Sequence, residues 1–208
     1  MVTLGKLDFK KELKELYSAS KKEVSVVEVP EINYLMVDGR GDPNTEKSFQ
    51  EAIEALYGLS FTLKFKAKKG PLDTDYVVMP LQGLWWAEDM DVFTLDKKGE
   101  WLWTLMIMQP DFISSELLID AKEELKKKKD PAALDKVRLE TYHEGLSAQI
   151  LHIGPYAEEG PTVKKLHDFI QANGYSLHGK HHEIYMSDAR RTAPEKLKTI
   201  LRQPMRKA

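Results

Sequence analysis

The segment from His181 to Met186 combines residue types that could do chemistry with a spacing that groups them. Alternate side chains of an extended strand share a face, so His181, Glu183 and Tyr185 project together and the residues between them point toward core. A carboxylate among apolar neighbours costs free energy to bury unless it is hydrogen-bonded or ion-paired. We therefore select Glu183 as the candidate chemical centre. The alternative is a strand whose polar face meets solvent.

The four tryptophans of the chain are the second feature that could form a binding site. They occur in two close groups, Trp85-Trp86 and Trp101-x-Trp103. Such rings can sandwich a planar ligand or face a cation. Core packing explains them equally well, since large aromatic side chains are mostly buried. The sequence leaves open which aromatic residues line a cleft. The candidates are Tyr76, Trp85, Trp86, Trp103, Tyr142 and Tyr156.

The composition excludes several classes of function. The 208 residues are 42% hydrophobic and carry 31 basic against 33 acidic side chains, so no excess of positive charge is available to hold nucleic acid. The absence of cysteine removes disulfides, thiolate nucleophiles and cysteine-based zinc sites. The sequence shows neither a signal-peptide core nor an apolar run of membrane-spanning length. We expect a cytoplasmic protein that does not bind membranes.

Motifs of common cofactor enzymes are also missing. His181 and His182 fall on opposite faces of a strand, which argues against a metal site there. The Gly39-Arg40-Gly41 turn lacks the rest of a dinucleotide fingerprint. No Gly-x-Ser-x-Gly elbow is present. We therefore expect neither a cofactor nor a metal.

Hydrophobic periodicity predicts alternating helices and strands along the chain. The expected helices are Lys6 to Tyr17, about Glu46 to Tyr57, Pro161 to Ala172, and two within 114–139, of which the second starts at Pro131. The expected strands are Val24 to Val29, Tyr34 to Val37, Tyr76 to Leu81, Trp101 to Met108, Gln149 to Ile153, Glu183 to Met186 and Leu197 to Arg202. The basic stretch from Lys64 to Pro71 is expected to be a solvated loop.

An internal repeat organises these elements. The order strand, glycine turn, helix, strand, strand occurs twice, and the copies end in Gln109-Pro110 and Gln203-Pro204. The repeat predicts an α+β fold of duplicated βαββ modules, with antiparallel sheets around a pseudo-twofold axis and a ligand cleft at the module junction. Aligning the third elements places Tyr76 opposite Glu183.

The C-terminal motifs resemble a known family. The run His182 to Asp188, followed by Arg190 to Thr199, is similar to the C-terminal signature of GyrI-like proteins, and Gln149 to Tyr156 is similar to their middle motif. The resemblance implies an N-terminal helical extension at 1–23 and a GyrI-like domain at 24–208. Module one would span about 24–112, connecting helices 114–139, and module two 140–208.

The resemblance also implies a function. Family members bind planar hydrophobic or cationic molecules, as in multidrug binding, above the glutamate of a Glu-x-Tyr motif, which corresponds to Glu183 and Tyr185. This chain resembles a stand-alone subgroup in which some members detoxify DNA-alkylating cyclopropanoids by hydrolysing their cyclopropane. The resemblance thus implies a cyclopropanoid cyclopropyl hydrolase. The alternatives are a non-catalytic drug sensor or sequestering protein and, third, an inhibitory partner of DNA gyrase.

Overall fold

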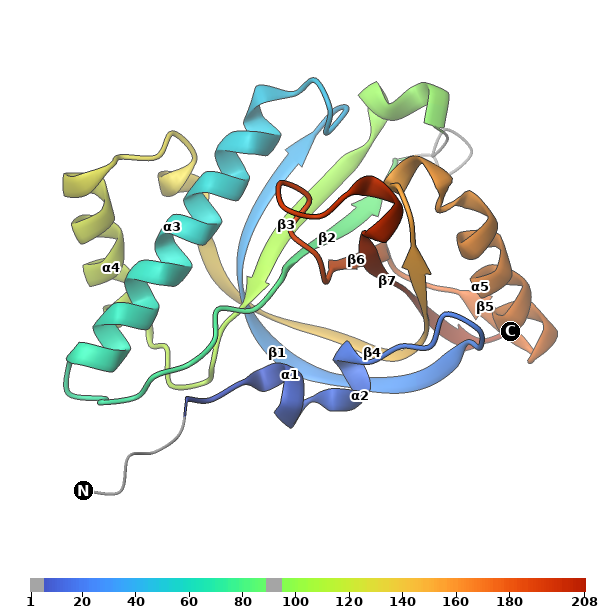
Figure 1. Cartoon of the computed structure of the whole chain (residues 1–208), viewed down its shortest axis with the longest axis horizontal. Coiled ribbons are helices and arrows are strands. Elements are labelled where there is room, and N and C mark those ends of the chain that lie inside the picture. The colour runs from blue at the N-terminus through green and yellow to red at the C-terminus, as the bar shows by residue number, and fades with distance from the viewer. Residues whose placement is uncertain (1–5, 89–94) are drawn as a thin grey trace.

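The computed structural model describes residues 6–88 and 95–208, a mixed α/β fold built on a seven-stranded antiparallel sheet (Figure 1). The first five residues of the predicted extension lie outside the described part. The strands are β1 (Ser25–Arg40), β2 (Leu81–Trp86), β3 (Leu102–Met108), β4 (Arg138–Ile153), β5 (Tyr175–Leu177), β6 (His181–Tyr185) and β7 (Lys198–Lys207). The helices are α1 (Phe9–Glu12), α2 (Lys14–Tyr17), α3 (Lys47–Lys69), α4 (Ser115–Lys128) and α5 (Gly160–Ala172).

The sheet closes on itself. Its order is β4-β1-β3-β2-β6-β7-β5, and β4 also pairs with β7, so all strands except β5 form a barrel-like ring. Closure gives these strands hydrogen-bonding partners on both sides and leaves few exposed edges. The central pairing joins β2 to β6, with Gly83 opposite Glu183. Residues one hundred positions apart in the sequence therefore become neighbours.

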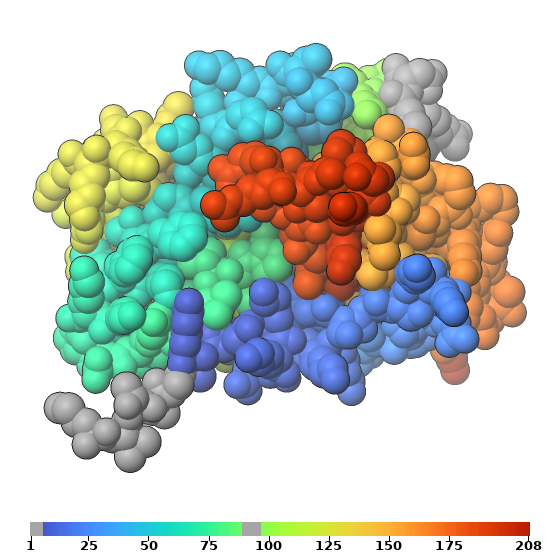
Figure 2. Space-filling view, viewed as in Figure 1, coloured from blue at the N-terminus to red at the C-terminus, as the bar shows by residue number. Residues whose placement is uncertain are grey.

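Two helices cover the outer face of this ring from opposite sides (Figure 1). Helix α3 packs against β1 and β3 of the sheet and against α4 beside it, and α5 packs against β4, β5 and β7. Fully buried leucines, including Leu56, Leu59 and Leu63, fix α3 to the sheet. Strands β2 and β6 lie between the two helices, and Figure 2 shows the segment after β6, in red, over this middle region. Outward-facing side chains of β2 and β6 are thus the floor of whatever space the helices leave.

The structure corrects several predicted elements in the first half. Helix α3 continues to Lys69, so the loop predicted at 64–71 is wrong. It continues because Lys64 is buried and donates hydrogen bonds to Asp75 and the Tyr76 carbonyl. The two predicted strands on either side of Pro30 form the single strand β1, because pairing with β4 resumes at Glu31.

Other boundaries also shift. The strand predicted at 76–81 instead begins at Leu81, so Trp85 and Trp86 lie within β2 and not in a connection. The helix predicted from Pro131 is only a short 3-10 turn, η3 (Leu134–Lys136). The first predicted helix is broken at Leu13 into α1 and α2. Helix α5 and strand β6 are confirmed close to their predicted positions. None of the helices within the described ranges is long and apolar enough to cross a membrane.

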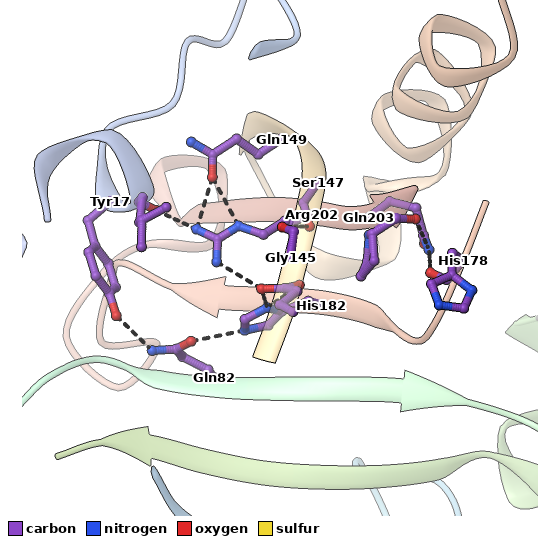
Figure 3. A network of polar contacts seen from close by, with 12 residues as sticks. Tyr17, Gln82, Gly145, Ser147, Gln149, His178, His182, Arg202 and Gln203 are labelled. Carbon is purple, nitrogen blue, oxygen red and sulfur yellow. Dashed lines mark hydrogen bonds and ion pairs between the residues drawn. The ribbon is translucent and has the colours of Figure 1, made fainter. Parts of the chain in front are cut away.

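The inner face of the ring contains a buried polar network (Figure 3). Glu144 of β4 accepts a hydrogen bond of 3.1 Å from Arg202 Nη1 of β7, and its other oxygen lies 2.9 Å from His182 Nδ1 of β6. Arg202 Nη2 also donates to Gln149 Oε1 at 2.9 Å. His182, which lies between His181 and Glu183 on β6, was predicted to face the core. It is fully buried, but its surroundings are charged.

The same network holds the N-terminal segment against the barrel. Arg202 Nη2 donates to the Leu16 carbonyl at 2.6 Å, and Gln149 Nε2 donates to the Glu15 carbonyl at 2.7 Å. Gln82 Nε2 donates to the Tyr17 hydroxyl at 3.2 Å. Short helices of four residues are unstable alone. The barrel interior therefore determines where α1 and α2 lie.

We expect Arg202→Met to lower the free energy of unfolding by about 3–5 kcal/mol, because it leaves the buried Glu144 carboxylate without its ion-pair partner. Urea denaturation followed by circular dichroism measures this change. Arg206→Met is the matched control on the same strand, where the side chain is exposed. We expect the control to change stability by less than about 0.5 kcal/mol. Equal effects of the two substitutions would contradict the assigned role of Arg202.

We expect acid to weaken the barrel through Glu144. Burial raises the pKa of the Glu144 carboxyl, but His182 and Arg202 beside it more than offset this and lower the pKa from 4.5 to about 2. The folded state is thus stabilised above pH 4.5, and this contribution is lost as the pH falls toward 2. Urea denaturation at several pH values should show a weaker acid dependence for Glu144→Gln. An identical dependence in both proteins would refute this.

Candidate functional site

A cavity with a volume of about 2240 Å³ lies over β2 and β6, between α3 and the start of α5. Its walls include residues of α3, the segment 186–190 after β6, and the turn η4 (Tyr156–Glu158) that precedes α5. Pockets for drug-sized ligands usually measure about 300–1,000 Å³. This groove is therefore large enough for an extended polycyclic molecule.

Glu183 lies on the floor of the cavity at the end of a chain of hydrogen bonds. Trp85 Nε1 donates to the Tyr185 hydroxyl at 3.1 Å, and that hydroxyl donates to Glu183 Oε2 at 2.8 Å. The other oxygen of Glu183 lies 3.6 Å from His181 Nε2. The Glu183 side chain is 16% exposed, so it is sheltered but still reached from the cavity.

Strand geometry explains this chain. Tyr185 and Glu183 are two residues apart on β6 and share its outer face, and β2 places Trp85 on the same face. Burial, followed by the negative charge of Glu183, holds the pKa of Tyr185 well above its usual value of 10.0. Tyr185 therefore keeps its proton and donates it to Glu183 in a fixed direction. Gly83 between them leaves room for the indole and the phenol.

Aromatic rings line the cavity around this carboxylate. Trp85 packs against Phe49 at 5.8 Å and against Trp101 at 5.8 Å between ring centroids. Tyr156 packs edge-on against Tyr185 at 5.6 Å. Flat ligands stack on such surfaces, and cations are attracted to their faces.

A second acid, Glu159, lines the same cavity directly before α5. Its side chain is buried, and one of its oxygens, Oε1, has no hydrogen-bond partner among the described residues. Burial, and then the charge of Glu183, raises the pKa of Glu159 to about 9. Glu159 therefore keeps its proton at neutral pH.

The structure places four of the predicted site residues in the cavity wall: Glu183, Tyr185, Trp85 and Tyr156. Tyr76 is not among the lining residues. It is buried before β2, where its ring packs against Phe112. Trp103 is buried beneath Phe49 and also lies outside the lining.

The remaining two predicted residues lie elsewhere as well. Trp86 is on the opposite face of β2 from Trp85, and the ammonium of Lys180 lies 3.4 Å from the centroid of its ring. Tyr142 packs in the main core near Glu144 and is not part of the cavity wall. Both positions follow from the alternation of side chains along a strand.

Sequence reasoning missed part of the wall. Tyr57, Phe61 and Phe65 of α3 line the cavity, at intervals of four residues that keep them on nearby positions of one helical face. This spacing was available as a signal, but the helix was predicted to end at Tyr57. Glu159 gave no such signal, because an acidic residue before a helix is ordinary.

The described residues contain no group of three or more metal-binding side chains that could hold a metal ion. The arrangement can bind a flat or cationic molecule and orient a water molecule against Glu183. A closed antiparallel sheet with an acidic, aromatic cavity between two helices defines a small-molecule-binding protein.

The chain belongs to the GyrI-like family. Residues 22–205 match the model of the GyrI-like small molecule binding domain. This match confirms the family that the C-terminal motifs predicted. No curated protein is significantly similar in sequence.

Solved structures from Listeria innocua are similar over nearly the whole chain. An uncharacterized conserved protein is 44% identical, with a TM-score of 0.89, and the alignment covers 97% of this chain and 100% of that one. A hydrolase is 42% identical with a TM-score of 0.87 and the same coverage. The C-terminal domain of EcmrR, 13% identical over 89% of this chain and 98% of that one, shares the fold with a TM-score of 0.56.

We expect Gly83→Ala to weaken ligand binding without unfolding the protein. The added Cβ would lie 2.7 Å from Trp85 Nε1 and 3.1 Å from the Tyr185 hydroxyl, so the hydrogen-bond chain to Glu183 must shift. The Kd for the planar cation proflavine should rise about tenfold, as measured by quenching of tryptophan fluorescence. Gly99→Ala is the control, because a Cβ there meets no atom within 4 Å. Unchanged affinity in Gly83→Ala would contradict this geometry.

Proposed function

We propose that the protein binds planar hydrophobic or cationic molecules in this cavity and hydrolyses the cyclopropane of DNA-alkylating cyclopropanoids. The observation that carries the proposal is the Glu183 carboxylate, held by Tyr185 at 2.8 Å on the floor of an aromatic cavity. Similar structures described as hydrolases, 41% and 42% identical, support a hydrolytic reaction.

The substrate chemistry suits such a site. In these compounds the cyclopropane is conjugated to a dienone, so attack by water on the cyclopropane carbon opens the strained ring and forms an aromatic phenol. Glu183 would orient the water and take its proton. Tyr185 fixes one oxygen of Glu183, which leaves the other to face the incoming water.

The aromatic walls would place the flat substrate. Trp85, Trp101 and Tyr156 offer ring surfaces in different orientations, and stacking on them would hold the reacting carbon near Glu183. Because the strained ring is already reactive, placement and proton transfer are the main contributions that the protein must make.

The duplicated modules belong to the same proposal. The element orders β1-α3-β2-β3 and β4-α5-β6-β7 match two βαββ units, with β5 inserted in the second. We propose that a pseudo-twofold axis relates them, with the cavity at their junction, and that residues 1–23 form a separate extension. A cytoplasmic location is part of the same proposal.

A non-catalytic sensor or sequestering protein is the second candidate. The size of the groove and the carboxylates facing it favour capture of a cationic drug. Contact with DNA gyrase, the third candidate, requires an exposed surface instead of a cavity and draws no support from this site.

We expect the wild-type protein to convert many equivalents of a cyclopropanoid and Glu183→Gln to be slower by about 10²–10⁴-fold, because the amide cannot accept the proton of water. Loss of the dienone absorbance measures the rate. Glu195→Gln, at an exposed position, should keep full activity. Full hydrolysis by Glu183→Gln would remove the assigned base, and conversion of a single equivalent by the wild type would identify a binder.

A further inference from the structure

Glu159 is an acid in the cavity to which the proposed hydrolysis assigns no role. Its side chain is 6% exposed and borders the same space as Glu183. Its Oε1 has no hydrogen-bond partner among the described residues. An ionised carboxylate is costly to bury without donors, whereas a neutral carboxylic acid is tolerated more easily.

The adjacent helix does not explain this side chain. Glu159 occupies the position before Gly160, the first residue of α5, where acidic side chains commonly bond to free backbone N–H groups. The side chain of Glu159 makes no such capping hydrogen bond. Its carboxyl group is therefore available to the cavity and not used to stabilise the helix.

Among the groups that face Glu159, Glu183 favours its neutral form, whereas the Thr199 side chain of β7 opposes it with a smaller effect that lowers the pKa. Glu183 and Tyr185 approach from β6, and Tyr156 approaches from η4. Of these, Glu183 contributes a negative charge, which together with burial raises the pKa of Glu159 to about 9. A carboxyl group kept neutral by burial beside a second carboxyl group is a usual arrangement for a general acid.

The ring opening also requires a proton donor, and Glu159 is a proton-bearing side chain beside Glu183 in the cavity wall. The electron pair released when the cyclopropane opens ends on the dienone oxygen, which must be protonated to give the phenol. The Tyr185 hydroxyl already donates its proton to Glu183. Among the other groups in the cavity wall, Glu159 is a buried carboxylic acid with an unbonded oxygen, which suits it to donate this proton.

We propose that Glu159 is the proton donor of the ring opening and Glu183 its base, an inference that rests on the proposed hydrolysis. A bond forms between the water oxygen and the cyclopropane CH₂ while the bond from that carbon to the ring breaks. The electron pair moves through the dienone to its oxygen, which takes the proton of Glu159. Glu183 takes a proton from the water, and exchange with solvent then restores both acids.

The test compares Glu159→Gln with wild type on a synthetic spirocyclopropyl cyclohexadienone. We expect kcat to fall about 10²-fold with KM little changed, because the amide fills the same volume but cannot deliver the proton. In the wild type, kcat/KM should fall as the pH rises past about 9, where Glu159 loses its proton. This alkaline decline should be absent in Glu159→Gln and retained in Glu159→Asp, which keeps an acid.

Glu158→Gln is the matched control, because Glu158 is the neighbouring residue and is exposed. It should leave both the rate and the pH profile unchanged. Carbon-13 NMR of glutamate-labelled protein gives a readout that does not depend on turnover. One carboxyl signal should titrate near pH 9 in the wild type and in Glu158→Gln and vanish in Glu159→Gln.

The outcomes separate the two proposals. If the wild type turns over and Glu159→Gln keeps the full rate and the alkaline decline, the role of Glu159 is wrong and the hydrolysis stands. The absence of a carboxyl signal titrating near pH 9 also overturns the role of Glu159. A wild type that does not open the dienone overturns the hydrolysis, and the proton donor with it.

Discussion

The pairing of β2 with β6 is the interaction on which the site depends. It sets Gly83 opposite Glu183 and places Trp85 beside Tyr185, so that side chains one hundred residues apart share hydrogen bonds. These two strands lie between the helices, so their outer face borders a cavity and not a packed core. The absence of a side chain at position 83 and the bulk of the indole at 85 then shape the floor around one carboxylate.

The surroundings on the two faces of β6 shift the pKa values of nearby carboxyl groups in opposite directions. On the inner face, Glu144 is paired with both His182 and Arg202, and these two partners lower its pKa. On the outer face, Glu159 has no such partner, and burial beside Glu183 raises its pKa. The carboxyl group of Glu144 is thus ionised and structural, whereas that of Glu159 is neutral and available for chemistry. The difference is the presence of His182 and Arg202 beside Glu144.

Local patterns predicted the parts of the site that depend on local geometry. The alternation of residues 181–185 places Glu183 and Tyr185 on one face, and they are hydrogen-bonded in the structure. The repeat, however, was aligned on residues 75–80, so it placed Tyr76 and not Gly83 opposite Glu183. Because the helix was predicted to end at Tyr57, Phe61 and Phe65 were not recognised as residues of the same helical face. Local patterns could not identify Glu159, because its raised pKa comes from burial in the folded protein and not from its neighbours in the sequence.

The attachment of the N-terminal segment has a consequence for how the chain folds. The hydrogen bond from Arg202 to the Leu16 carbonyl joins residues 186 positions apart, and the β1–β4 and β2–β6 pairings of the ring join residues about one hundred positions apart. Folds dominated by such contacts form slowly, since the entropy of closing long loops is lost before the contacts are gained. Neither half of the chain can complete the ring alone. Ligand affinity should therefore develop late during refolding and in a single step.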